Sequence, residues 1–203
     1  MTEAIEIICV GNELLIGNVV NTNAQWLAKR ITTMGLKVNR LTVVGDDTNE
    51  ISTAIKEALQ PPRVKLATLP KNAEPVPNPV GTAPGVIVKQ ENTTIVALPG
   101  VPSEMETIFD ESVAPMLKRV AGNVTFYEVA VAVTGIMESD IAPLIDKTMR
   151  DNPYVYIKSH PSRTGEGTPH LKLHLSTTAP DSNTAKNRVA KALIQIAELI
   201  QVK

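Results

Sequence analysis

The sequence is poor in cysteine, in aromatic residues and in uncompensated charge. Its single cysteine, Cys9, excludes a disulfide framework within the chain and a zinc site built from cysteines. The 20 basic and 21 acidic residues leave a net charge of -1, which argues against a protein that binds nucleic acid through overall charge. Aromatic residues make up only 3% of the chain, which argues against a base-stacking surface. We therefore do not expect nucleic acid as a partner.

Long apolar runs are also lacking. No run reaches the roughly 20 residues that are needed to cross a bilayer, and the acidic start of the chain lacks the features of a signal peptide. With 203 residues, 43% of them hydrophobic, the chain can bury the core of one or two globular domains without disulfides or metals. We expect a cytoplasmic protein that makes no contact with a membrane.

Apolar runs alternate with helical periodicity in the first half of the chain. Ile5–Val10 predicts a strand buried on both faces, and residues 37–44 predict a second strand. Helices are expected over 21–34 and again directly after the second strand, with Asn21, Thr22 or Asn23 as a cap of the first helix and Gly35 at its end. The order strand, helix, strand, helix predicts an α/β domain with a largely parallel sheet.

Prolines interrupt this alternation. Between residues 61 and 84 they predict an extended and irregular path. Two strands over 86–88 and 94–98, joined by a polar turn, are expected next. Ser103 is then expected to cap a helix that reaches about Val120.

Gly122-Asn123 marks the expected boundary between a first domain, 1–121, and a second domain, 122–203. The second part has the order strand, helix, strand, strand, helix, which predicts a small α+β domain with its own antiparallel or mixed sheet. Within it, His170 and His174 alternate with leucines, which favours an ordinary polar strand face over a metal site.

The first expected strand ends in Gly11-Asn12-Glu13, and Asn21-Thr22-Asn23 lies at the start of the next helix. Ligands collect at the carboxyl ends of strands in open parallel sheets, and free backbone N–H groups at a helix start favour an anion. Two interpretations stay open: a ligand-binding loop, or a turn followed by a helix cap. The segment is neither a dinucleotide-binding fingerprint nor a Walker loop.

Asp46 and Asp47 directly follow the second expected strand. Adjacent carboxylates at a strand end can hold Mg²⁺ through one or two oxygens, while phosphates complete the coordination shell. The alternative is helix capping, because acidic side chains are also favoured at a helix start.

Two loops framed by prolines follow. The first, residues 78–85, contains Gly81 and Thr82, and the second, residues 98–105, contains Gly100 and Glu104. Rigid loops of this kind can form the wall of a small-molecule site, with Glu104 as a metal ligand or base. A structural crossover and the helix electrostatics of a first-turn glutamate are the alternatives.

These segments together resemble a known family. Taken in order, residues 8–17, 21–23, 44–47, 78–85 and 98–105 resemble the molybdopterin-binding-like domain of the competence/damage-inducible protein A family. That domain belongs to the superfamily of the molybdenum-cofactor biosynthesis proteins. The tail of the chain resembles the small KH-like domain that follows in longer members, with the βαββα order. The resemblance implies a three-layer α/β domain with a mostly parallel sheet.

The resemblance also implies a function. Some relatives bind molybdopterin and adenylate it, and others are associated with metal-dependent ADP-ribose pyrophosphatase activity. It implies a catalytic role for Asp46 and Asp47, with Mg²⁺ or a similar divalent cation at Asp46, a phosphate-bearing or pterin-type ligand, and a homodimer. The ligand-binding residues that it implies are Gly11, Asn12, Glu13, Asn21, Asn23, Gly81, Thr82, Gly100 and Glu104.

One family segment has no counterpart in this sequence. The family carries a core strand and a Gly-Gly-x-Gly-Pro-Thr-x-Asp-Asp loop. At the corresponding place this chain has only the short stretch of residues 59–63. Glycine-rich loops cradle phosphates, so their loss implies impaired hydrolysis. A non-catalytic binding or scaffold protein that retains the fold is the alternative function.

Overall fold

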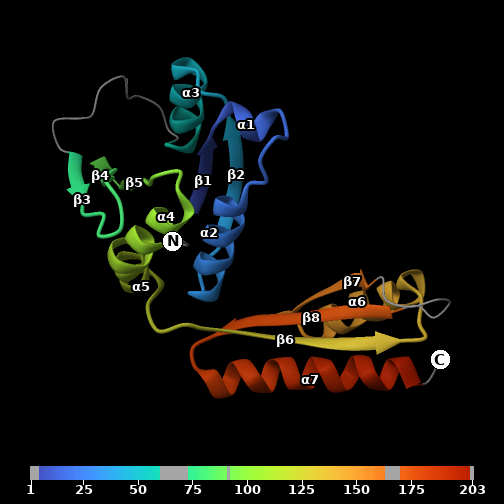
Figure 1. The fold of residues 1–203 in the computed structure, drawn as a ribbon. Coiled ribbons are helices and arrows are strands. Elements are labelled where there is room, and N and C mark those ends of the chain that lie inside the picture. The colour runs from blue at the N-terminus through green and yellow to red at the C-terminus, as the bar shows by residue number, and fades with distance from the viewer. Residues whose placement is uncertain (1–4, 60–72, 91, 163–169, 202–203) are drawn as a thin grey trace. The chain divides into compact units, whose positions relative to one another are not determined.

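The computed structural model describes residues 5–59, 73–90, 92–162 and 170–201. The backbone forms two compact units (Figure 1). One unit joins Met1–Thr32 with Leu36–Gly122, and the other joins Thr33–Gly35 with Asn123–Lys203.

The first unit begins with a parallel pair of strands. The pair is formed by β1 (Ile5–Val10) and β2 (Val38–Val44), which are connected through α1 (Asn12–Leu15) and α2 (Thr22–Thr33). Helix α3 (Thr48–Ala58) follows β2 and packs on both strands. Figure 1 shows α1 and α3 at the end where both strand arrows point. The predicted alternation of strands and helices is therefore confirmed here.

Strand β1 is less buried than the sequence predicts. Ile7 is buried, its neighbours are half-buried, and Val10 is 44% exposed. The reason is that, in the part of the chain that the structure describes, β2 is the strand paired with β1, so this sheet has two strands. A parallel strand is buried on both faces only where a wider sheet is covered by helices. The prediction of a strand buried on both faces is wrong.

A second sheet of the first unit is antiparallel and has the order β3 (Ala73–Val76), β4 (Gly85–Gln90), β5 (Thr93–Ala97). Strand β3 lies inside the proline-rich segment, for which the sequence predicts an irregular path, and in these residues that prediction is wrong. Pro75 is compatible with a strand because β3 is an edge strand, where a missing N–H leaves no ladder bond unmade. The mixed α/β class is confirmed, and among the described strands the parallel pairing is that of β1 with β2.

The long helix expected after residue 103 is divided into α4 (Pro102–Ile108), a π-helical turn η1 (Phe109–Val113) and α5 (Ala114–Ala121). Pro115 has no N–H to donate, and its ring would clash with a carbonyl one turn back, so a wider turn accommodates it. The predicted cap, Ser103, is also wrong. Val101 stands at the cap position and Pro102 opens the helix, where a missing N–H has no cost.

The second unit has the predicted βαββα order. Its elements are β6 (Thr125–Thr134), α6 (Glu138–Asp151), β7 (Tyr156–Ser162), β8 (His170–Ala179) and α7 (Ser182–Gln201). The three strands form an antiparallel sheet with β8 in the centre.

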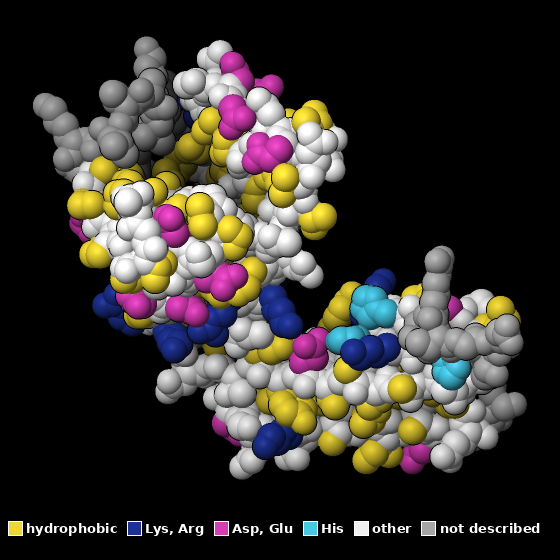
Figure 2. Space-filling model, viewed as in Figure 1, with side chains coloured by type: hydrophobic (Ala, Val, Ile, Leu, Met, Phe, Trp, Pro, Cys, Tyr) yellow, Lys and Arg dark blue, Asp and Glu magenta, His cyan; other side chains and the backbone are white. Residues whose placement is uncertain are grey.

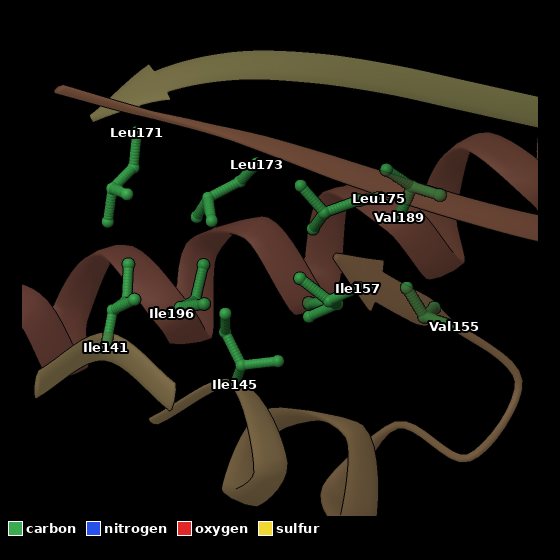
Figure 3. Packing of buried hydrophobic residues seen from close by; sticks show 10 residues of the cluster. Ile141, Ile145, Val155, Ile157, Leu171, Leu173, Leu175, Val189 and Ile196 are labelled. Atoms are coloured by element: carbon green, nitrogen blue, oxygen red, sulfur yellow. The ribbon is translucent and has the colours of Figure 1, made fainter. Parts of the chain in front are cut away.

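Both helices of the second unit pack on one face of this sheet. Figure 3 shows Leu171, Leu173 and Leu175 of β8 pointing toward isoleucines of α6 and apolar residues of α7. Leu173 and Leu175 are completely buried. Because side chains alternate across a strand, the intervening residues of β8 lie on the other face of the sheet.

Candidate functional site

The carboxyl ends of β1 and β2 are tied together by Asn12 and Asp46. The N–H of Asn12 donates to Oδ2 of Asp46 at 3.2 Å, and the N–H of Asp46 donates to Oδ1 of Asn12 at 3.3 Å. The N–H of Gly11 donates to the carbonyl of Val44 at 3.0 Å. The structure thus brings Gly11, Asn12 and Asp46 together as the sequence predicts for neighbouring strand ends, and the side chain of Asp46 is exposed.

Two of the predicted glycines lie close to carboxylates. The carboxylate of Glu13 lies over Gly11, and the carboxylate of Glu104 lies over Gly81. In each case the acid occupies the space that a Cβ atom would need, so a larger residue would displace it. These glycines therefore leave room for two of the acidic residues of the candidate site.

Asp47 caps helix α3. Its Oδ1 accepts the N–H groups of Asn49 at 2.8 Å and of Glu50 at 3.1 Å. Glu50 in turn accepts the N–H of Gly45 at 3.0 Å, a contact that the sequence analysis missed. The spacing of Asp47 and Glu50 is that of a capping box, in which Glu50 would accept the N–H of Asp47 itself, so it does not indicate the contact with Gly45. The capping alternative for Asp47 is the arrangement that the structure shows.

A pair of substitutions at Asp47 separates capping from catalysis. Asp47→Ala is expected to lower the free energy of unfolding by about 0.5–2 kcal/mol, because two N–H groups lose their acceptor. Asp47→Asn is expected to retain most of that stability, since the amide oxygen still accepts both bonds. Urea titrations measure both values. A loss of equal size in the two variants would contradict a capping role.

A hydrogen bond from the side-chain amide of Asn23 joins the starts of α2 and α4. Nδ2 of Asn23 donates to the carbonyl of Gly100 at 2.8 Å. Oδ1 of Asn21, one of the three expected caps, accepts the N–H of Ala24 at 3.1 Å. Nδ2 of Asn21 is buried and has no hydrogen-bond partner among the described residues. Buried amide groups are rarely left unpaired, so this atom marks a place where a further acceptor would be favourable.

An open pocket of about 270 Å³ lies beside this junction. It is lined by Thr22, Asn23, Gln25, Trp26, Lys29, Pro102 and Glu106. Trp26 is held edge-on against Phe109, with ring centres 5.5 Å apart. Trp26 lies within the helix that the sequence predicts over 21–34, as one of the apolar residues at helical spacing. Nothing in the sequence indicates that Lys29 and Glu106 line one pocket, because their proximity depends on how α2 and α4 pack.

Further predicted residues near the start of α4 surround Asn78. Its Nδ2 donates to Oε2 of Glu104 at 2.7 Å and to the carbonyl of Ala83 at 2.8 Å. Its Oδ1 accepts the N–H of Val80 at 3.2 Å. Glu104 therefore holds the loop that contains Gly81, while Thr82 of the same loop is exposed.

The predicted residues thus gather in two places in the first unit. Asn12, Glu13, Asp46 and Asp47 lie at the ends of β1 and β2, while Asn21, Asn23, Gly81, Gly100 and Glu104 lie along the starts of α2 and α4. Within the described ranges, no group of three or more His, Cys, Asp or Glu residues is arranged to hold a metal ion.

One carboxyl group outside these places has a clearly lowered pKa. Hydrogen bonds from the hydroxyl and the N–H of Thr184 hold the pKa of Asp181 below its usual range. Asp181 precedes α7, where it accepts hydrogen bonds from the first turn of that helix, so its low pKa reflects capping.

Among the described helices, none is long and apolar enough to cross a membrane.

Comparison with known proteins decides the family. The sequence matches a family model described as a probable molybdopterin binding domain over residues 6–68 and 59–119. The chain belongs to this family. A protein of Pyrobaculum arsenaticum is 37% identical, with 96% of this chain and 94% of that protein aligned. A protein of Pyrobaculum aerophilum is 38% identical over 97% of this chain and 94% of its own length.

A solved structure supports the same conclusion. The CinA protein with unknown function from Thermoplasma acidophilum is 28% identical and has a TM-score of 0.50. It covers 57% of this chain and 98% of its own chain. The predicted resemblance to the competence/damage-inducible protein A family is therefore confirmed for the molybdopterin-binding-like domain. The likeness of the tail to KH domains stays a prediction.

The alignments with the relatives are longer than this chain. They run over 248 and 250 positions, whereas the chain has 203 residues. These relatives therefore carry residues that have no counterpart here. The two stretches of the family match meet at residues 59–68. The segment that the sequence analysis finds missing belongs at the same place, and residues 60–72 lie outside the described part of the structure.

Proposed function

We propose that this family member binds a small phosphate-bearing or pterin-type molecule in its first unit and hydrolyses a nucleotide pyrophosphate bond slowly at most. The observation that carries the proposal is the pocket between the starts of α2 and α4. It combines a helix N-terminus, an aromatic ring and two opposite charges within one lining.

Each part of this lining suits one part of such a ligand. The pocket lies at the N-terminal end of α2, and the exposed amine of Lys29 adds a positive charge, so both favour a phosphate. The ring of Trp26 offers a flat apolar surface for a heterocycle. The carboxylate of Glu106 can accept hydrogen bonds from the amino groups that pterins and adenine carry.

The proposed metal would depend on Asp46. Magnesium is usually held by one or two carboxylates, with waters and substrate phosphates as the other ligands. Asp46 fits this role because it is exposed and shares only one of its oxygens with the N–H of Asn12. A bound cation polarises phosphoryl oxygens. Asn12 would hold the carboxylate in place, and the ligand itself would have to supply most of the coordination.

A non-catalytic binding protein is the second candidate. It is favoured because neighbouring acidic side chains already make hydrogen bonds that hold the structure together. Asp47 is used as a helix cap, and Glu104 is hydrogen-bonded to Asn78. Each acid therefore already has one carboxylate oxygen in a contact that holds its own loop.

Calorimetry with ADP-ribose tests the binding site. Lys29→Ala is expected to weaken binding by about 1.5–3 kcal/mol, because a charged partner of the phosphate is lost. Trp26→Ala is expected to weaken it by about 1–3 kcal/mol through lost stacking. Lys56→Ala, which removes an exposed lysine from α3, is the charge-matched control and should leave the affinity unchanged.

A second arm of the same experiment tests the metal. Asp46→Ala is expected to weaken binding of ADP-ribose when Mg²⁺ is present and to have no effect when it is absent. If wild-type protein takes up no ADP-ribose and no phosphorylated pterin at millimolar concentration, the proposed function is wrong. Equal affinities for the Lys29 and Lys56 variants would place the ligand elsewhere.

We also propose that the chain forms a homodimer through an apolar surface of the first unit. Leu15, Ile16, Val19 and Val20 are 53% to 78% exposed, and large exposed apolar patches mark interaction sites. Light scattering at micromolar concentration is expected to give twice the mass of 21.9 kDa. Ile16→Asp with Val20→Asp should return the monomer mass. A wild-type monomer at that concentration would refute the dimer.

A further inference from the structure

Two histidine side chains from neighbouring strands meet on the surface of the second unit. His160 lies on β7 and His174 lies on β8, and their ring centres are 5.2 Å apart in an edge-to-face arrangement. Figure 2 shows histidine side chains next to one another on the surface of this unit. Two of the three histidines of the chain are therefore in contact.

The register of β7 and β8 brings the two rings together. Lys158 pairs with His174, and His160 pairs with Lys172, so the histidines are diagonal neighbours. Diagonal neighbours on one face of an antiparallel pair are within reach of aromatic side chains. Leu173, which precedes His174, is completely buried beneath the helices. Because side chains alternate along a strand, His174 points to the opposite face of the sheet.

The spacing of the rings is that of two ligands on one metal ion. A histidine nitrogen binds zinc at about 2.0–2.1 Å, so a shared ion lies roughly 3 Å from each ring centre. At a tetrahedral angle the two ring centres are then about 5 Å apart, which agrees with the 5.2 Å between His160 and His174. An imidazole turns easily about χ2, so each ring can direct a nitrogen at the ion without a shift of either strand.

A carboxylate fixes the position of the proton on His174. Oε1 of Glu128, on β6, lies 3.1 Å from Nδ1 of His174. An ionised carboxylate only accepts hydrogen bonds, so Nδ1 carries the proton, and Nε2 of the neutral ring keeps its lone pair. Metal-bound histidines almost always donate their other ring N–H to a carboxylate, a backbone carbonyl or a water. Glu128 and His174 have this arrangement.

The neighbours of the two histidines leave the site open. Ala130 of β6 pairs with His174, so a small side chain stands on the far side of that residue and leaves room for water ligands. Lys158 and Lys172 stand opposite the histidines, and both are exposed. Their charges disfavour a cation, but water and salt screen charges at exposed positions. The lysines therefore lower the affinity for a cation without blocking the site.

We propose that His160 and His174 bind one divalent transition-metal ion, with Glu128 as the positioning residue of His174. Two imidazoles without a thiolate suit Cu²⁺, Ni²⁺ and Zn²⁺, whereas Mg²⁺ and Ca²⁺ require oxygen ligands. Water completes the coordination shell. The ion joins the edge strand β7 to the central strand β8.

This pair of histidines differs from the one that the sequence suggests. Alternation with leucines places His170 and His174 on one strand, where an ordinary polar face is the favoured interpretation. The structure instead brings His174 together with His160 of the neighbouring strand. A site with two protein ligands is smaller than the groups of three or more, none of which is arranged to hold a metal within the described ranges.

Isothermal titration calorimetry of the full chain, without an affinity tag and with Mg²⁺ in excess, tests the proposal with Zn²⁺ and Cu²⁺. Cu²⁺ is expected to bind more tightly than Zn²⁺, as it does at most nitrogen sites. His160→Gln and His174→Gln are each expected to weaken binding at least tenfold, because one of two ligands is lost. His170→Gln removes the third histidine, which is also on β8, and as the matched control should leave the affinity unchanged.

Substitutions around the pair test how the site is built. Glu128→Ala is expected to weaken metal binding about tenfold, the lower end of the range for residues that orient metal-bound histidines. Glu128→Gln should restore part of the affinity, since its amide oxygen still accepts the N–H of Nδ1. Lys158→Ala with Lys172→Ala is expected to tighten metal binding, because two positive charges are removed. A site for anions would show the opposite response to the lysine variant.

Two further readouts separate metal ligation from a structural role of the histidines. Electron paramagnetic resonance of bound Cu²⁺ is expected to show coupling to two imidazole nitrogens in the wild type and to one in each of His160→Gln and His174→Gln. Zn²⁺ is expected to raise the urea concentration at which the second unit unfolds, because a ligand of the folded state stabilises it. The fluorescence transition of Trp26, in the first unit, should stay in place. Circular dichroism checks that each variant retains the sheet.

Three outcomes would overturn the proposal. The first is no binding of Zn²⁺ or Cu²⁺ at submillimolar concentration, and the second is an equal loss of affinity in His170→Gln. The third is unchanged affinity in the double variant His160→Gln with His174→Gln, which would place the ion elsewhere, for example on the thiol of Cys9. The site takes no Mg²⁺ and lies in the second unit, so its failure leaves the ligand pocket of the first unit untouched.

Discussion

Leu173→Ala is expected to lower the free energy of unfolding of the second unit by about 2–5 kcal/mol. Leu173 is completely buried at the centre of the sheet, between α6 and α7. Removing its side chain leaves a cavity that the surrounding strands and helices cannot close fully. Ile194→Ala is the control, because Ile194 is 60% exposed on α7 and should change stability by no more than about 0.5 kcal/mol.

The single tryptophan allows unfolding of the first unit to be followed separately. Trp26, the single tryptophan, belongs to the first unit. In urea, Leu173→Ala should shift the unfolding transition seen by far-UV circular dichroism while leaving the tryptophan fluorescence transition in place. An equal shift of both signals would show that the two units unfold as one cooperative core, which would contradict two independent domains.

Turnover of ADP-ribose in the presence of Mg²⁺ is expected to be at least 10²–10³-fold slower than the 10 s⁻¹ or so of a typical enzyme. A pyrophosphate transition state needs several preorganised charges, and loss of even one such contact has an effect of this size. Among the described residues, Asp46 is not part of a cluster of three or more side chains that could hold a metal ion. The relatives also carry residues that this chain lacks.

The same assay shows whether the residual activity belongs to the proposed site. Asp46→Asn should abolish what turnover there is, because the amide keeps the shape of the side chain and removes its charge. Asp140→Asn, at an exposed position of α6, serves as the control. Turnover near 10 s⁻¹ that persists in Asp46→Asn would mean that another part of the chain supplies the catalytic groups.

Local patterns predicted those elements that local physics determines. The alternation of leucines and polar residues over 170–175 specifies both the strand and its buried face, and the core of the second unit follows it. Gly35, with φ of 81°, ends α2 as expected, because glycine adopts this left-handed conformation without strain. Asn21 caps the same helix. Each of these features depends on residues that are close in the sequence.

Features that depend on distant partners were missed. The exposure of β1 depends on which strands stand beside it, and the strand β3 depends on pairing with β4. The contact between Asn23 and Gly100 joins residues 77 positions apart. The ring contact between His160 and His174 arises from strand register, which places these residues diagonally on β7 and β8. None of these relations is encoded in the spacing of one segment.

The central claim is that a phosphate-bearing ligand binds in the first unit, between the starts of α2 and α4. Amide chemical-shift mapping by NMR with ADP-ribose and Mg²⁺ tests it most directly. We predict shifts at Asn23, Trp26 and Lys29, with a further shift at the N–H of Asn12, which donates to Asp46. The amides of the second unit should not move. Shifts confined to the second unit, or none in the first, would contradict the claim.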